Sequence, residues 1–256
     1  KIIISYVKKN YKVIVVSSAM SGVTNELLLK TKKIAKNFPN DEKDVILSTG
    51  EQISCALIAG KLNDLGYKSR SWLGWQIPII TRGSHCSSRI IKIHKAKILN
   101  YLKKGGIPII TGFQGINSNF RITTIERGGS DTSAILCAKF FKAEKCIIYT
   151  DVEGVYTTDP NLIKTAKKIN KISYEEMLEL ASQGAKVLQT RSVELAMRKN
   201  TKLSVRSSLK PKKFGTMITD EKSVLENNTV SGITYSKDEA KITLSRVQDK
   251  PGVSSK

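Results

Sequence analysis

Short runs of β-branched residues alternate along this chain with longer amphipathic stretches, and this alternation restricts the possible folds more than any other feature. Strands are predicted at residues 12–17, 67–72, 76–81, 107–111, 145–150 and 202–206. Helices are predicted at residues 24–35, 51–65, 89–104, 131–141, 174–181 and 186–199. This order is typical of an α/β protein, so we expect a three-layer sandwich with a mainly parallel central sheet.

The pattern changes at the polar, proline-bearing segment SSLKPKKFG (207–215). After it, short strands are predicted at residues 216–219, 230–235 and 241–244. We therefore predict one domain over residues 1–215, a linker over 216–228 and the beginning of a second, α+β domain over 229–256. One or two strands without a covering helix cannot bury their apolar face. The start is equally abrupt, since residues 2–8 resemble the tail of a helix, so we expect the first domain to be truncated at its N-terminus.

Composition argues against several classes of protein. No apolar run approaches the roughly 20 residues that a membrane-spanning helix needs, and no secretion signal is present. The net charge of +21 comes from 34 lysines and 9 arginines spread along the whole chain, and aromatic residues make up only 6%. Base-reading surfaces favour arginine and interleaved aromatics, so we expect solvated faces rather than a nucleic-acid partner.

The four cysteines are far apart and include no C-x-x-C pair. We therefore expect free thiols in a reducing, cytoplasmic compartment and no metal held by protein side chains.

In open parallel sheets, ligands bind beyond the carboxyl ends of the strands. After the first predicted strand, the loop from Ser18 to Thr24 combines hydroxyls with one glycine and leads into a helix. Such a loop can bind an anion or simply cap the helix, and both interpretations stay open.

A second loop, GFQG (112–115), follows the strand at residues 107–111, and some residues later comes the segment R-G-G-S-D (127–131). Its adjacent glycines, Gly128 and Gly129, let the backbone approach a ligand closely. Arg127 offers a planar fork for a carboxylate or phosphate. Ser130 or Asp131 can cap the following helix, and Asp131 can equally serve a metal–phosphate group.

A third loop, TDVEGVYTTDP (150–160), has more acids and hydroxyls than a structural turn needs. Tyr156 could stack on a base, and Thr150 and Asp151 could hydrogen-bond a nucleotide. The chain contains neither a Walker loop nor a G-x-G-x-x-G fingerprint, so any ATP site must use another arrangement.

Together these segments resemble the aspartate kinases of the amino-acid kinase family. The matching stretches are VVSSAMSGVTN (15–25), STGEQIS (48–54), TGFQG (111–115), TTIERGGSDT (123–132), IYTDVEGVYTTDP (148–160), SYEEMLELASQGAKVL (173–188) and VRSS (205–208). The end of the chain looks like the first strand of the ACT-type regulatory domain of this family. The resemblance implies the amino-acid kinase fold, the substrates ATP and L-aspartate, Mg²⁺ carried by ATP, and the product 4-phospho-L-aspartate at the start of lysine, threonine and methionine biosynthesis. It also implies a homodimer in the full-length protein.

Carried over residue by residue, the resemblance implies two groups of site residues. The aspartate would be surrounded by Ser18, Thr24, Glu51, Phe113, Arg127, Gly128, Gly129, Ser130 and Asp131. The nucleotide would be held by Thr150, Asp151, Tyr156, Asp159, Lys186 and Val187, with Lys186 and Asp131 in catalytic roles. Arg127 can grip an α-carboxylate and Glu51 can bind an α-ammonium, a pair that selects a free amino acid.

This sequence departs from the family in two places. The family's K-F-G-G or K-Y-G-G strand would precede Lys1, and Asn161 stands where an arginine contact to the nucleotide phosphates is usual. We therefore expect little kinase activity from these residues alone. The alternatives are another amino-acid kinase, such as an acetylglutamate or uridylate kinase, and a fragment of a split gene that needs a complementing N-terminal piece.

Overall fold

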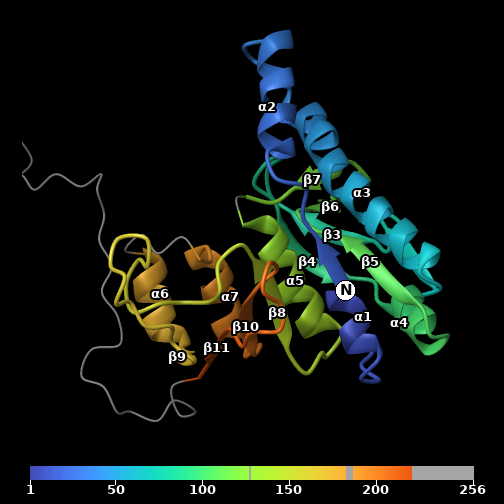
Figure 1. Ribbon diagram of the computed structural model, residues 1–256. Coiled ribbons are helices and arrows are strands. Elements are labelled where there is room, and N and C mark those ends of the chain that lie inside the picture. Colours follow the sequence, from blue (N-terminus) through green and yellow to red (C-terminus); the bar gives the residue numbers. More distant parts are fainter. Residues whose placement is uncertain (127, 183–186, 221–256) are drawn as a thin grey trace, which may run out of the picture.

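The computed structural model describes residues 1–126, 128–182 and 187–220. In Figure 1 the elements β8–β11, α6 and α7 form one group, and most of the earlier elements form another, with α5 between them. Within the described residues, none of the helices combines the length and apolar character that crossing a membrane requires.

A three-stranded parallel sheet forms the centre of the first group. Its order is β1 (Val15–Ser17), β5 (Ile107–Thr111) and β2 (Ser69–Trp72). All five residues of β5 are buried, as expected for a β-branched run flanked on both faces. Ser17 pairs with Thr111, so the two strands end side by side.

A four-stranded sheet of order β4-β3-β6-β7 adjoins it. Its strands are β3 (Ile79–Arg82), β4 (Arg89–Ile93), β6 (Gln114–Ile116) and β7 (Ile122–Thr124). The helix predicted at 89–104 is wrong in its first part, because β4 pairs antiparallel with β3 and only α4 (Ala96–Lys103) is helical. Three isoleucines in the first five residues fit a strand as well as a helix, and pairing with β3 decided between them.

The longest helix, α3 (Asn40–Asp64), begins well before the predicted start at residue 51. Asp41 and Glu42 lie in its first turn, where acidic side chains are favourable. The hydroxyls of Ser48 and Thr49 donate to carbonyl oxygens one turn earlier, so these polar side chains have partners within the helix itself. Glu51 therefore lies in the middle of a helix.

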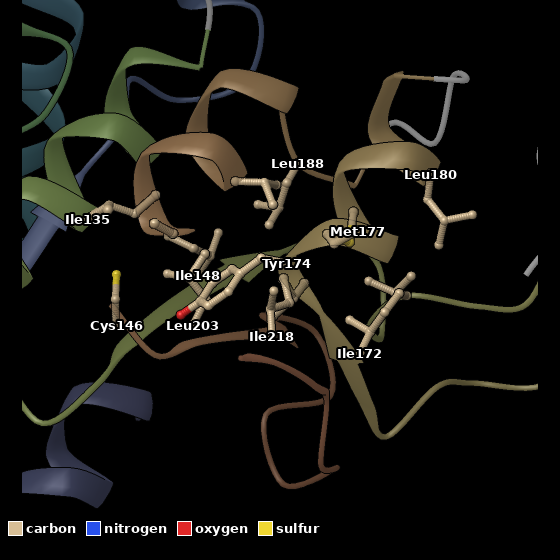
Figure 2. Close-up of a cluster of buried hydrophobic side chains, with 14 of the residues drawn as sticks. Ile135, Cys146, Ile148, Ile172, Tyr174, Met177, Leu180, Leu188, Leu203 and Ile218 are labelled. Carbon is tan, nitrogen blue, oxygen red and sulfur yellow. The ribbon is translucent and has the colours of Figure 1, made fainter. Parts of the chain in front are cut away.

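The second group contains a sheet of order β8-β10-β11-β9. Its strands are β8 (Cys146–Thr150), β9 (Lys171–Ser173), β10 (Leu203–Ser207) and β11 (Thr216–Thr219). Figure 2 shows the apolar cluster between this sheet and the helices α6 (Tyr174–Ser182) and α7 (Thr190–Lys199). Ile148, Leu203 and Ile218 project from the sheet, and Met177 projects from α6.

Strand β11 (Thr216–Thr219) confirms the short strand predicted at 216–219, within the predicted linker of 216–228. It pairs antiparallel with β10 and parallel with β9, so residues 216–219 belong to the packed sheet. Because β11 is hydrogen-bonded to a neighbouring strand on each side, residues 216–219 have a fixed place in this sheet. The rest of that linker and the predicted second domain (229–256) lie outside the described residues, apart from Asp220, and the division there stays a prediction.

Helices α2 (Val23–Ile34) and α5 (Gly129–Phe140), together with α6, confirm three predicted helices. The helix predicted at 186–199 begins at Thr190, and Lys186 lies outside the described residues. The mostly parallel pairings and covering helices confirm the α/β fold, with the described strands hydrogen-bonded into three sheets.

Two helices connect the groups of elements. Helix α5 packs Ile135 into the cluster of Figure 2 and Leu136 into a second cluster with Trp72 and Ile110. Helix α1 (Ile2–Val7) packs against β5, and the hydroxyl of Tyr6 lies 3.1 Å from that of Tyr149 on β8. The two groups are therefore joined by α5 and, at Tyr6, by α1.

Candidate active site at the ends of the parallel strands

The loop after β1 begins the candidate site. Gly22 precedes α2 with φ 82°, and no side-chain hydrogen bond caps this helix. Of the two open interpretations, capping by a hydroxyl is therefore excluded for α2. Ser18 is exposed and Thr24 is partly buried, so both hydroxyls lie where a ligand could reach them.

Glu51 is buried against this loop, with only 3% of its surface exposed. Its Oε1 accepts a hydrogen bond from the backbone amide of Ala19 at 3.0 Å. Its Oε2 is buried, and no group in the described part of the chain donates to it. Burial raises the pKa of Glu51 to about 7, although the Ala19 amide acts in the opposite direction. A buried carboxylate with an unused oxygen is suited to bind a cation.

The end of β5 lies against the same loop. The amide of Gly112 donates to the carbonyl of Ser17 at 3.0 Å, which continues the pairing of β5 with β1. A Cβ on Gly112 would lie 2.9 Å from the Ser130 hydroxyl, so only glycine allows this approach. Phe113 follows with φ 63°, and its amide donates to the Ser133 hydroxyl at 3.1 Å.

The glycines before α5 fit closely into their surroundings. Gly128 has φ 75° and occupies the N-cap position, so the predicted capping by Ser130 or Asp131 is wrong. A Cβ on Gly129 would lie 2.8 Å from the ring of Phe113. Asp131 lies in the first turn of α5, and burial raises its pKa to about 6. Arg127 lies outside the described residues.

The loop after β8 is held by the segment between β10 and β11. The carbonyl of Thr150 accepts hydrogen bonds from the Ser208 amide at 2.7 Å and from its hydroxyl at 2.9 Å. The Thr150 hydroxyl donates to the exposed carboxylate of Asp151 at 3.0 Å. Glu153 forms ion pairs with Lys210 and Lys213. Thr150 and Asp151 are thus neighbours in a braced loop.

The remaining predicted nucleotide residues have different environments. Tyr156 is partly buried, and its backbone forms an isolated antiparallel β-bridge with that of Lys168. Asp159 accepts a hydrogen bond from the Asn161 amide at 2.8 Å, which makes a local turn. Val187 packs against the cluster of Figure 2, so its side chain serves the core. Lys186 lies outside the described residues.

Helix α5 brings the two groups of predicted site residues to one end of the sheets. Its C-terminus leads within a few residues into the start of β8, and Ile135 packs with Ile148 of that strand. Helix and strand therefore run in opposite directions, which places the N-terminus of α5 at the carboxyl end of β8. That N-terminus also contacts Gly112 at the ends of β1 and β5. Glu51, Phe113 and Ser130 thus share one edge with Thr150.

Several groups at this edge were not predicted from the sequence. The Ala19 amide could not be singled out from the sequence, because every residue except proline has a backbone amide N–H. Ser208 was quoted only within the motif VRSS, and its role depends on a contact with Thr150. Gly50 packs against the Ala19 side chain, and from the sequence it was quoted only within the motif STGEQIS. Among the described residues, no group of three or more acidic, histidine or cysteine side chains could hold a metal ion.

Comparisons with known proteins agree with this architecture. A family model described as the amino acid kinase family matches residues 1–207. An aspartate kinase of Pseudomonas fluorescens is 47% identical over 247 residues, which cover 95% of this chain and 59% of that protein. The chain therefore spans about three-fifths of the length of this relative.

Solved structures show the same similarity. An aspartate kinase from Synechocystis is 40% identical with a TM-score of 0.74, over 85% of this chain and 36% of that one. Aspartokinase III of E. coli, solved in complex with aspartate and ADP, is 26% identical with a TM-score of 0.71, over 81% of this chain and 57% of that one.

Proposed function

Because the chain belongs to the amino acid kinase family, we propose that it transfers the γ-phosphoryl group of ATP to the side-chain carboxylate of L-aspartate. The product is 4-phospho-L-aspartate. The similar protein from Pseudomonas fluorescens is named an aspartate kinase, and the E. coli relative was solved with aspartate and ADP. Both names support this choice within the family.

The observation that carries the proposal is the state of Glu51. One oxygen is held by the Ala19 amide, and the other is buried without a partner in the described residues. The α-ammonium of a free amino acid supplies both a hydrogen bond and a compensating charge, which lowers the pKa of this carboxylate. An N-acetylated amino acid keeps one amide N–H but brings no compensating charge.

The rest of the amino-acid side follows from the same edge of the sheet. Arg127 binds the α-carboxylate through its planar fork. Phe113 and the glycines before α5 shape the pocket, and Ser18, Thr24, Ser130 and Asp131 contribute polar contacts. The positive end of α5 favours the negative charge that gathers there during transfer.

The nucleotide binds beside the end of β8. Thr150 and Asp151 hydrogen-bond the nucleoside, and Tyr156 stacks on the base. Lys186 contacts the phosphates, with Asp159 and Val187 nearby. The contacts of Thr150 with Ser208 support this assignment, because they hold the loop in one shape before a ligand arrives.

Transfer requires little covalent chemistry from the protein. The side-chain carboxylate of aspartate is already ionised at pH 7, so no general base is needed to activate it. Catalysis consists of aligning that oxygen with the γ-phosphoryl group and neutralising charge. The hydroxyls and carboxylates after β8 are the hard oxygen donors that suit Mg²⁺, which the ATP phosphates would carry and which would offset their charge.

The wider context of the full-length protein belongs to the same proposal. It comprises a cytoplasmic location, a homodimer formed through regulatory ACT-type domains, and the first step of lysine, threonine and methionine biosynthesis. Two rivals remain: an acetylglutamate or uridylate kinase, and a chain that needs a complementing strand bearing K-x-G-G.

Calorimetric titration with L-aspartate and with N-acetyl-L-aspartate tests the proposal, because the two differ at the α-ammonium. We expect aspartate to bind at least tenfold more tightly and Glu51→Gln to remove that preference. Equal binding of both, or selective binding of acetylglutamate or UMP, contradicts it. Turnover is measured by trapping the acyl phosphate with hydroxylamine, with and without a peptide bearing K-x-G-G. Turnover that appears only with the peptide supports the alternative that the chain needs a complementing strand.

A further inference from the structure

We propose that Arg191 and Ser192, at the start of α7, are positioning residues that hold the turn before α5 in its substrate-binding shape. The inference rests on the proposed function, because this turn is assigned to the amino-acid substrate. Neither residue belongs to the motifs that the resemblance assigned to substrate contacts. Their effect is exerted through Glu126 and Gly128.

The first contact is an ion pair. Arg191 Nη1 donates to Glu126 Oε2, and the Ser87 hydroxyl donates to Glu126 Oε1. Both oxygens of Glu126 are therefore used, one by α7 and one by the loop between β3 and β4. Ser87, Arg191 and nearby Arg89 hold the pKa of Glu126 below its usual value, so the carboxylate is ionised at neutral pH.

The second contact is buried. The Ser192 hydroxyl donates to the Gly128 carbonyl at 3.5 Å and lies 3.4 Å from the Thr132 hydroxyl. The same carbonyl accepts the Thr132 amide at 3.0 Å, the first hydrogen bond of α5. Ser192 is only 1% exposed, so water cannot replace its hydroxyl.

The backbone at Gly128 makes these contacts specific. A Cβ there would lie 2.9 Å from the Cβ of Gln189, so α7 packs directly on the turn. Helix α7 belongs to the group of elements around β8, whereas Glu126 follows β7. Arg191 and Ser192 therefore join the two groups at the position where the amino-acid and nucleotide sides meet.

Hydrogen exchange in the ligand-free chain tests the positioning role directly. We expect the double variant Arg191→Gln with Ser192→Ala to exchange the amides of Thr132 and Ser133 roughly fivefold faster than the unaltered chain. Arg191→Lys, which keeps the charge, should restore most of the protection lost in Arg191→Gln. Unchanged exchange in the double variant would overturn the proposal.

The matched control is Arg198→Gln. Arg198 also forms an ion pair from α7, but with Glu194 on the same helix at 2.7 Å, and it lies about two helical turns beyond Arg191. We expect Arg198→Gln to show the same amide hydrogen exchange and the same aspartate affinity as the unaltered chain. An effect as large as that of Arg191→Gln would indicate a general loss of α7 rather than a role in positioning.

Ligand binding completes the test. The double variant should bind aspartate about tenfold more weakly, while its affinity for an ATP analogue changes less than twofold. Faster exchange with unchanged aspartate affinity overturns the positioning role. If the unaltered chain binds no aspartate, the proposed function fails, whereas the exchange measurement still decides whether Arg191 and Ser192 hold the turn.

Discussion

The backbone amide of Ala19 donates a hydrogen bond to Oε1 of Glu51, at 3.0 Å, and so joins the loop after β1 to the middle of α3. This bond gives one of the two carboxylate oxygens a hydrogen-bond donor. The other oxygen is buried without a donor in the described part of the chain. Glu51 is therefore both a structural contact and a group prepared to bind a cation.

The raised pKa of Glu51 makes stability depend on pH. Its pKa is about 7 in the folded chain and 4.5 in the reference state, so its favourable contribution is complete below pH 4.5 and is lost as the pH rises through 7. Glu51→Gln cannot ionise. We expect it to be more stable than the unaltered chain by up to about 3 kcal/mol at pH 8, with no such gain at pH 4.5. Urea unfolding across this range measures the difference, and a gain independent of pH contradicts the assignment.

Aspartate binding should follow the same ionisation in the opposite direction. The α-ammonium needs the charged form of Glu51, whose pKa is about 7, so we expect the affinity to rise about tenfold between pH 6 and pH 8 and then level off. Glu51→Gln should bind weakly at every pH in this range. Calorimetry in buffers of different ionisation enthalpy also detects the released proton, and a flat profile in the unaltered chain argues against Glu51 as the ammonium partner.

Two glycines of α3 provide a matched pair. A Cβ on Gly50 would lie 2.8 Å from the Ala19 side chain, whereas Gly60 has nothing within 4 Å. We expect Gly50→Ala to lower the free energy of unfolding by about 1–3 kcal/mol and to weaken aspartate binding. Gly60→Ala should raise it by about 0.5–1 kcal/mol without affecting binding. The same response from both variants would show that the loop after β1 does not depend on this contact.

Asp44 is the acceptor that holds the loop between β3 and β4. It is fully buried and accepts hydrogen bonds from the Cys86 amide at 3.0 Å and from the Thr124 hydroxyl. We expect Asp44→Asn to lower the free energy of unfolding by about 2–3 kcal/mol, because an amide nitrogen in place of Oδ2 cannot accept from the Cys86 amide at 3.1 Å and lacks the charge opposite His85 Nδ1 at 2.6 Å. Asp41→Asn, which alters an exposed pair with Arg121, should change it by less than about 0.5 kcal/mol. Denaturant titration measures both, and equal effects contradict the buried role.

Thr216 of β11 supports the loop after β8. Its buried hydroxyl accepts the Val155 amide at 2.8 Å and donates to the Ile169 carbonyl at 2.6 Å. We expect Thr216→Val to lower the free energy of unfolding by about 1–3 kcal/mol and to weaken nucleotide binding. Thr157→Val removes an exposed acceptor for the Lys167 amide and should have an effect below about 0.5 kcal/mol. If Thr216→Val leaves the nucleotide affinity unchanged, β11 does not support the nucleotide site.

The regions predicted correctly are those whose local pattern has one solution. The run Ile107–Thr111 is apolar except for its last residue and is bounded by glycines, so a buried strand was the simplest compact choice. Helix α5 likewise follows from a glycine turn and an apolar body. The position of Glu51 in α3 was harder, because Gly50 and the polar residues before it resemble a loop until their hydroxyls bond within the helix.

The amino-acid sequence by itself determined the α/β class, the order of most elements and the chemical types at the candidate site, because periodicity and residue chemistry are local properties. Only the tertiary structure decided that Arg89–Ile93 pairs as a strand and that Thr216–Thr219 enters a sheet. It also decided that Glu51 meets the Ala19 amide and that Ser192 meets the Gly128 carbonyl. Such contacts join residues far apart in the chain, and their energies depend on burial, which no local pattern specifies.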